Sequence, residues 1–570
     1  MKKALTVFVT VFLLCTAGCS SKPVPGADIS TEVPVFSMPS GIYEQPVKLE
    51  LSSENNFDIY YTTDGSVPTR NSRRYRRTIT LKDATGKADY LASKEIASLT
   101  TVDGWLRSIL EDTSLPKANI IRAACIDSEG NTGPVVTETY WVGHDPAAMY
   151  GVPVLSLVVD PDDLLDYETG IMAKGAIYDE WIKTPEGQEY LQEEPGMQEV
   201  TANFSQHGKA WERNAYISMF DEAGSLQFEQ NAGIRIRGGF TRSLPQKSFN
   251  LYFRKDYGSG TLKYALFDDA KDLQGNTITA YKKFALRNGG NDAQFLMFRD
   301  CLIQNLLKDR SFETQESYPV ILFLNGEYWG VYTMLEVYDD QYCESHYGVD
   351  RDNVVIIEED ELDEGEDEDI LLYEEFKSYA DKDLTDPEVW KAFSSTVDTE
   401  NMAEYFAAEI YFGNEDFAPD KNIRLWRVRT PGYTCSEDDG RWRFMMYDTE
   451  YCAGLYLHDN TSSGYDHYAA ALEHFPVFAS VMKNAEFRNL FLNKIKEIGS
   501  VNFAPERVNE EIAALAAQYR PLMQDHYLRF GGNYTIWDSE YEHVQQYFKE
   551  RYDLIIPMIE KDLEDSSLLK

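Results

Sequence analysis

The sequence has few cysteines and few basic residues for its length, and both shortages exclude classes of protein. Seven cysteines in 570 residues, with no Cys-x-x-Cys pair, make neither a disulfide framework nor a zinc site. Five of them lie beyond the N-terminal segment, where one bridge is open but not determined by the sequence. The 54 basic side chains face 95 acidic ones, and the net charge of −41 argues against nucleic acid as a partner.

Several catalytic patterns are absent as well. The eight histidines lack the HxxxH and HExxH spacings of zinc hydrolases, and the Gly-x-Ser-x-Gly elbow of serine hydrolases does not occur. The HRD and DFG strings of ordinary protein kinases are also missing. The composition, with 43% hydrophobic and 13% aromatic residues, instead indicates two or three folded domains with large cores.

Residues 1–19 predict a secretory signal. Two lysines precede an apolar run from Ala4 to Leu14, which is too short to span a bilayer. Cys19 follows small residues and resembles the lipidated cysteine of bacterial lipoproteins, although Thr16 stands where such signals prefer Leu, which leaves ordinary signal cleavage open. Residues 20–33 predict a tether. We therefore expect a location in the cell envelope, outside the cytoplasm, with the membrane contacted through the lipid only.

Residues 34–145 predict a small all-β sandwich of immunoglobulin-like type. The segment Val47–Leu51 alternates as a half-buried strand does, and Asp-Gly at 64–65 is a turn signal. The string at 60–69 resembles the YYTxDGSxPT signature of the sandwich found at the C-terminus of chitobiases and β-hexosaminidases, and residues 75–117 resemble a long insertion in it. No catalytic constellation lies here, so we expect a spacer or docking module.

Residues 150–562 predict a large α+β domain with four clusters of polar residues. The first, at 233–251, has the pattern of a strand, a glycine-rich turn and a second strand beginning at Lys247, an arrangement suited to gripping phosphate. The second, at 318–336, contains Asn-Gly at 325–326, which predicts a type I′ hairpin. Glu336 ends its second strand, where its carboxylate could hold Lys247. Either pattern alone is common in purely structural hairpins.

The third and fourth clusters supply oxygen ligands. In the third, at 409–426, a helical pattern ends at Gly413 and a loop with Asp416 and Asn422 follows. The fourth, at 442–450, predicts an apolar strand with Asp448 and Glu450 on one side, because residues i and i+2 share a face. An Asp, an Asn six residues later and a strand ending in Asp form the layout of a kinase site, which needs magnesium ligands and a carboxylate beside the acceptor hydroxyl.

In order and spacing the four clusters resemble the spore coat protein H (CotH) family, secreted proteins with an atypical kinase-like fold. The matching strings are RGGFTR with PQKSF, LNGEYWGVYTMLE, NED with KN, and YDTE. Two departures are Glu450, where the family has a second Asp, and Gly239-Phe240, where it has Asn-Ser. The resemblance implies a multidomain chain, with the small sandwich followed by a large α+β atypical protein-kinase-like domain.

The resemblance also implies a function and its residues. The residues implied to bind ATP are Lys247, Glu336 and Arg237, the catalytic acid/base is Asp416, and the ligands of Mg²⁺ or Mn²⁺ are Asn422, Asp448 and Glu450. The implied reaction transfers the ATP γ-phosphoryl to Ser or Thr of a surface or coat protein. The alternatives are a catalytically inactive, kinase-like surface or polysaccharide-associated binding lipoprotein, and another phosphoryl or nucleotidyl transferase on the same scaffold.

One further segment is unusual. Residues 358–369 (EEDELDEGEDED) hold ten acidic residues in twelve. Such a run is typical of a solvated loop, and the spacing of an EF-hand calcium loop is absent. We therefore expect neither calcium nor a basic partner at this segment.

Overall fold

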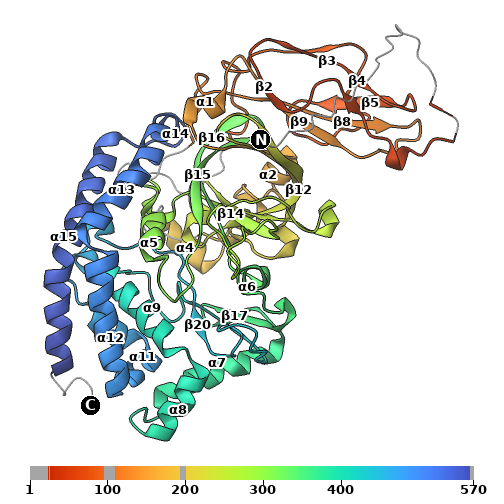
Figure 1. Cartoon of the computed structure of the whole chain (residues 1–570). Helices are drawn as coiled ribbons and strands as arrows, with labels where there is room; N and C mark the ends of the chain where they lie inside the picture. The colour runs from red at the N-terminus through yellow and green to blue at the C-terminus, as the bar shows by residue number, and fades with distance from the viewer. Residues whose placement is uncertain (1–22, 25, 95–108, 193–199, 565–570) are drawn as a thin grey trace, which may run out of the picture.

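The computed structural model describes residues 23–24, 26–94, 109–192 and 200–564. Figure 1 shows a β-sandwich, a β-barrel, a smaller second sheet and a set of C-terminal helices along one side. Among the described residues, no helix has the length and apolarity to cross a bilayer. The five cysteines in these ranges are all free.

The sandwich follows the predicted alternation. Its main sheet has the order β2-β9-β8-β5-β6, with β2 (Gly41–Tyr43), β5 (Asp58–Thr62), β6 (Arg73–Arg74), β8 (Asn119–Ile126) and β9 (Val136–Val142). Opposite it lie two strand pairs, formed by β1 (Val35–Phe36) with β4 (Leu51–Ser52) and by β3 (Val47–Leu49) with β7 (Ile79–Leu81). Val47, Leu49 and Leu51 are buried in its core, while Lys48 and Glu50 are exposed.

The barrel is closed by seven strands. Their order is β10-β11-β12-β13-β14-β16-β15, with β10 (Val154–Val159), β11 (Arg213–Phe220), β12 (Leu226–Arg237), β13 (Ser248–Tyr252), β14 (Lys283–Arg287), β15 (Ser317–Leu324) and β16 (Glu327–Leu335). Asn325 and Gly326, with φ of 49° and 83°, join β15 to β16. Both φ values are positive, as the predicted type I′ turn requires.

The second sheet and the helices complete the fold. The sheet order is β18-β17-β19-β20, with β17 (Val354–Glu358), β18 (Glu361–Glu364), β19 (Arg424–Val428) and β20 (Arg443–Phe444). Helices near the barrel are α1 (Pro146–Tyr150), α2 (Pro161–Leu165), α3 (Gly175–Trp181), α4 (Pro185–Gln192), α5 (Arg299–Leu307) and α6 (Asp340–Tyr347). The later ones are α7 (Ile370–Lys377), α8 (Pro387–Thr396), α9 (Thr399–Phe412), α10 (His467–His474), α11 (Pro476–Val481), α12 (Ala485–Glu497), α13 (Pro505–Tyr519), α14 (Met523–Phe530) and α15 (Tyr534–Glu564).

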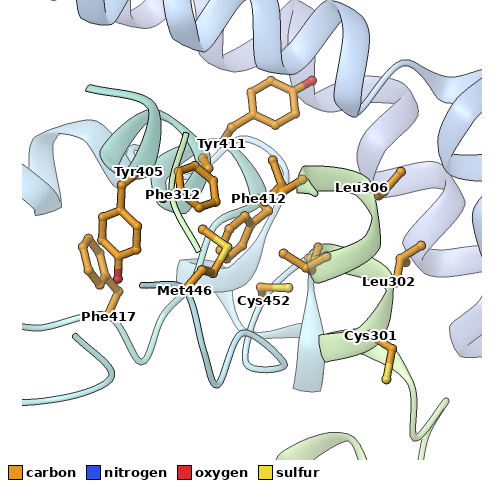
Figure 2. Close-up of a cluster of buried hydrophobic side chains, with 14 of the residues drawn as sticks. Cys301, Leu302, Leu306, Phe312, Tyr405, Tyr411, Phe412, Phe417, Met446 and Cys452 are labelled. Atoms are coloured by element: carbon orange, nitrogen blue, oxygen red, sulfur yellow. The ribbon is translucent and has the colours of Figure 1, made fainter. Parts of the chain in front are cut away.

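The largest hydrophobic core lies between the barrel and the helices that pack against it. Figure 2 shows side chains of α5, α9 and the segment after β20 gathered in it, among them Leu302, Phe412 and Met446, all of which are fully buried. Helix α9 ends where the sequence predicts, because Gly413 takes a left-handed φ of 73° and donates its N–H to Glu409 O at 3.1 Å. This core fixes the direction in which the chain leaves α9.

A buried polar interface joins the sandwich to the barrel. Asp89, from the insertion, accepts hydrogen bonds from Arg529 of α14 at 3.1 and 3.2 Å and pairs with Lys117 at 3.1 Å. Neither Asp89 nor Arg529 has any exposed side-chain surface. Glu327, at the start of β16, accepts hydrogen bonds from the backbone N–H groups of 90–92. The insertion thus packs the sandwich directly against the barrel.

We predict that Asp89→Asn destabilises the protein by about 3–5 kcal/mol, because it leaves a charged Arg529 buried without a carboxylate. Urea unfolding with circular dichroism measures the loss. The matched control is Asp256→Asn, whose partner Lys209 lies at 2.9 Å on the exposed surface, and it should leave the midpoint unchanged. Equal midpoints for the two variants would show that the interface contributes little.

Candidate functional site

The candidate site lies where the outer face of the barrel meets the second sheet. Phe284 and Leu286 fill the barrel core, so Ala285 and Arg287 face outward by the alternation of β14. Ala285 forms a small buried apolar cluster with Leu335 and Val337, at and beyond the end of the neighbouring β16. A small apolar patch and a basic residue therefore lie on one face of the barrel.

Arg287 holds three carboxylates together. Its Nη1 donates to Asp300 Oδ2 of α5 at 3.0 Å, and its Nη2 donates to Glu450 Oε2 at 2.7 Å and to Asp448. Burial disfavours the charge of the guanidinium, but the three carboxylates outweigh that effect and raise the pKa of Arg287. One side chain thus joins the barrel, α5 and the loop after β20.

Asp448 and Glu450 differ in exposure and in the direction in which their pKa values are shifted. The Asp448 side chain is 36% exposed, whereas that of Glu450 is only 3% exposed. Burial, together with the charge of Asp448, raises the pKa of Glu450 well above its usual range. Burial acts in the same direction on Asp448, but the neighbouring Arg287 outweighs it and lowers the pKa of Asp448. Burial thus favours the neutral form of Glu450, whereas Arg287 favours the charged form of Asp448.

The predicted strand at 442–450 is wrong in its extent. β20 ends at Phe444, and Asp448 has a left-handed φ of 57°. The two carboxylates are brought together by Arg287 and by the backbone behind them, where Asn291 N–H donates to Glu450 Oε1 at 3.1 Å. Gly290 has a φ of 60°, and a Cβ there would overlap Glu450 Oε1, so this position requires glycine.

The loop after α9 places Asp416 beside Asn422. Asn422 Nδ2 donates to Asp416 O at 3.2 Å, and Lys421 Nζ pairs with Asp416 Oδ1 at 2.7 Å. Asn422 has a φ of 57°, a left-handed backbone that asparagine tolerates better than most residues. The predicted pair of an Asp and an Asn six residues later therefore forms a single hydrogen-bonded loop.

Most acids of the run at 358–369 are exposed, as its composition predicts, but part of the run forms strands and not a loop. Its first residues form the β17–β18 hairpin, and Glu358 pairs with Arg424 of β19. Glu359 Oε1 accepts from Asn422 N–H at 3.1 Å and from the Tyr447 hydroxyl at 3.3 Å. The first two acids of the run are therefore held by an ion pair and by hydrogen bonds to residues of the site. Glu359 connects the Asn422 loop to the segment that carries Asp448.

Two families match the sequence. The model described as CotH kinase protein matches residues 234–555, which is more than half of the chain. The chain belongs to the CotH kinase family. The second model, described as Fn3 associated, matches residues 47–140, and the predicted fold class, a small β-sandwich followed by a large α+β kinase-like domain, is confirmed. No curated protein matches the sequence. The CotH match contains Arg287, its three carboxylates and the Asp416 loop.

The Lys247 side chain does not take part in the Arg287 group, although Gln246 and Ser248 on either side of it hydrogen-bond Asn288. Its side chain is fully buried, with Nζ 3.9 Å from the centre of the Phe204 ring and donating to Arg242 O. Burial, reinforced by the positive charge of Arg242, lowers the pKa of Lys247 well below its usual range. Within the described part of the chain, Lys247 has no carboxylate partner.

Glu336 also differs from its predicted position, whereas Arg237 lies in the site. The pairing of Glu336 with Lys247 is wrong, because Glu336 turns toward α6 and its Oε1 lies 2.9 Å from His346 Nε2. Arg237, the last residue of β12, donates to Asn250 at 3.2 Å. Ile236 fills the barrel core, so Arg237 faces outward as Arg287 does, and burial followed by the positive charge of Arg287 lowers the pKa of Arg237.

Arg287 and Asp300 are the residues that the sequence reasoning missed. Residues 283–287 (KFALR) alternate and end in a basic residue directly before Asn-Gly-Gly, the same kind of signal that drew attention to Lys247. Asp300 offers no comparable signal, since a single acid at the start of a helix is usually a helix-end charge. Only the packing of α5 against β14 shows its partner.

Glu409 supports the Asp416 loop from within the core. Its Oε2 accepts from Asn414 Nδ2 at 3.0 Å, and Asn414 Oδ1 accepts from Asp416 N–H at 3.1 Å. The Glu409 side chain is buried, with only 1% of the residue exposed, and burial raises its pKa to about 8. Glu409 is therefore protonated at neutral pH.

We predict that Glu409→Gln makes stability less dependent on pH. A raised carboxyl pKa means that wild-type stability is complete below the unfolded value near 4.5 and falls as the pH rises to about 8. The variant should match the wild type at pH 5 and exceed it at pH 8 by on the order of a few kcal/mol in urea unfolding.

The control is Glu404→Gln on the same helix. Glu404 pairs with Lys494 at 2.7 Å, and this ion pair and its hydrogen bonds outweigh burial and lower the pKa of Glu404. Its replacement should therefore destabilise the protein at pH 8. A Glu409 variant that loses stability equally at both pH values would contradict the assignment of a protonated Glu409.

Proposed function

We propose that the CotH domain is a kinase that transfers the γ-phosphoryl of ATP to a Ser or Thr hydroxyl of a surface or coat protein. The observation that carries the proposal is the position of Arg287, on a barrel strand between a carboxylate of a neighbouring helix and the carboxylate of Asp448. Kinases use the same relation between a strand lysine, a helix glutamate and a metal-binding aspartate. Arg287 takes the role that the sequence gave to Lys247, and Asp300 takes that of Glu336.

The side chains of the site fit Mg²⁺ or Mn²⁺. Asp448 and Asn422 offer the hard oxygen donors that these ions prefer, with Glu450 behind them. Among the described residues, no three acidic, His or Cys side chains are arranged to hold a metal ion by themselves, and Mg²⁺ in nucleotide sites usually takes one or two carboxylates and completes its shell with water and phosphate oxygens. When bound, the metal would neutralise charge on the phosphates.

The protein groups then have separate roles. Arg287 and Arg237 would bind and orient the phosphates, since a guanidinium matches phosphate oxygens with two parallel N–H groups. Asp416, held in place by Lys421, would orient the acceptor hydroxyl and take its proton. We also propose attachment to the envelope through a lipid on Cys19, which lies outside the described residues.

A second candidate is the catalytically inactive binding lipoprotein. Two observations favour it. Arg287 already contacts three carboxylates. Lys247, the lysine of the first sequence cluster, is fully buried and cannot reach a ligand. A scaffold that needs no nucleotide would keep these contacts permanently.

We predict that ATP with Mn²⁺ raises the thermal unfolding temperature of the wild-type protein. Ligand at about 100 times its Kd stabilises a protein by about 2.7 kcal/mol. Asp448→Asn and Arg287→Gln should lose the shift, because they remove a metal ligand and a phosphate ligand. Arg254→Gln, which breaks a barrel pair with Glu212 outside the site, should keep it. No shift with millimolar nucleotide would leave the inactive lipoprotein.

We further predict that Asp416→Asn keeps the nucleotide-dependent shift and slows phosphoryl transfer by about 10²- to 10⁴-fold, because only the proton acceptor is lost. Transfer is measured with ATP labelled at the γ-phosphate and a mixture of envelope proteins as acceptors. Label transferred instead from the α-phosphate would identify a nucleotidyl transferase and contradict the kinase assignment.

A further inference from the structure

The sandwich carries an arginine-rich segment that the CotH site does not use. Five arginines lie in the eight residues 70–77, and no acidic residue occurs from Gly65 to Lys82. The whole chain has 95 acidic and 54 basic residues. A segment with this many positive charges is therefore unusual for such an acidic chain. We call residues 70–77 the arginine segment.

Three of these arginine side chains have no partner in the part of the chain that the structure describes. Arg70 donates to the Asp127 carbonyl at 2.7 Å, and Arg74 pairs with Asp58. The side chains of Arg73, Arg76 and Arg77 are exposed and make no hydrogen bond or ion pair with the described residues.

Protection of a sheet edge does not account for the segment. β6 is an edge strand, and a charged residue on such a strand prevents pairing with another chain. However, β6 contains only Arg73 and Arg74. Arg76 and Arg77 lie beyond the ladder, and their charges need another explanation.

The segment runs toward the end of the sandwich that points away from the barrel. In the β5–β6 pairing Arg73 lies opposite Tyr61 and Arg74 lies opposite Tyr60, and the Arg74 side chain reaches Asp58, the first residue of β5. The turn that follows its last residue approaches the barrel, where Val67 N–H donates to Asp160 Oδ2 at 2.8 Å. Figure 1 shows the sandwich projecting from the barrel on the side opposite the C-terminal helices.

The N-terminal tether enters the sandwich at this same end. Val24 N–H donates to Asn55 O at 2.9 Å, and Asn55 precedes Asp58 by three residues. Cys19 lies five residues before Val24, and five residues span at most about 18 Å. A lipid on Cys19 would therefore hold this end of the sandwich close to the membrane surface.

We propose that the arginine segment binds the headgroups of anionic phospholipids and orients the protein on the membrane. This proposal rests on the proposed lipid attachment for its location, and it adds a second membrane contact to the lipid. Clustered arginines beside a lipid anchor attract an anionic bilayer surface. The acidic remainder of the chain is repelled by that surface, so the CotH site would face away from it, toward acceptor proteins.

The test uses the chain from residue 20 onward, which lacks Cys19, so that failure of lipid attachment does not affect the result. Sedimentation with vesicles of phosphatidylglycerol in phosphatidylcholine is compared with sedimentation with phosphatidylcholine alone. The variant is the triple change R73Q, R76Q and R77Q. The matched control is K391Q, K483Q and K549Q, three exposed lysines of the CotH domain whose side chains are unpaired among the described residues and which change the charge equally.

We expect the wild type to sediment with the anionic vesicles only and to be released by salt. The arginine variant should bind on the order of 100-fold more weakly, since each basic side chain near the surface contributes about tenfold or less, and the control should bind as the wild type does. Equal melting temperatures show that all three are folded. Absence of wild-type binding, or equal losses in the variant and the control, would overturn the proposal.

Discussion

The arrangement of the CotH domain depends on one guanidinium that binds three acidic side chains. Arg287 holds Asp300, Asp448 and Glu450 together at the junction of barrel, helix and loop, and without it these acids would lie side by side without its positive charge. Other buried arginines of this acidic chain also bind several partners at once. Arg299 and Arg551 have no exposed surface and join elements far apart in the sequence through carboxylates and backbone carbonyls. Arginine suits this role because its five donors reach several acceptors at once.

The insertion in the sandwich has the corresponding effect between domains. Asp89 and Glu327 reach across the boundary in opposite directions, one to a helix of the CotH domain and the other to the backbone of the insertion. Trp141 of the sandwich packs edge-to-face against Phe323 of β15. Because the contacts end on β15, β16 and α14, any movement of the barrel relative to the second sheet would carry the sandwich with it.

The sequence predicts the local features of the site better than the contacts between segments that lie far apart in the chain. The Asn-Gly hairpin at 325–326, the end of α9 at Gly413 and the Asp416–Asn422 loop each depend on a few neighbouring residues, and each is present. Lys247 and Arg287 both lie at barrel strands beside glycines, so their local signals are alike. Which of the two contacts the Asp448–Glu450 segment depends on residues up to 163 positions away, and no local pattern contains that information.

The three carboxylates that contact Arg287 differ in exposure, and this difference indicates how the site could accept a nucleotide. Asp300 and Glu450 are 10% and 3% exposed and would keep their hold on the guanidinium, whereas Asp448 is 36% exposed. Asp448 is thus the carboxylate that can exchange the guanidinium for a metal ion without being drawn out of the core. Under the proposed function, the freed Nη2 group would turn to the phosphates that arrive with the metal. The contacts that Arg287 makes with the two less exposed carboxyl groups would then keep it in position for an anionic ligand.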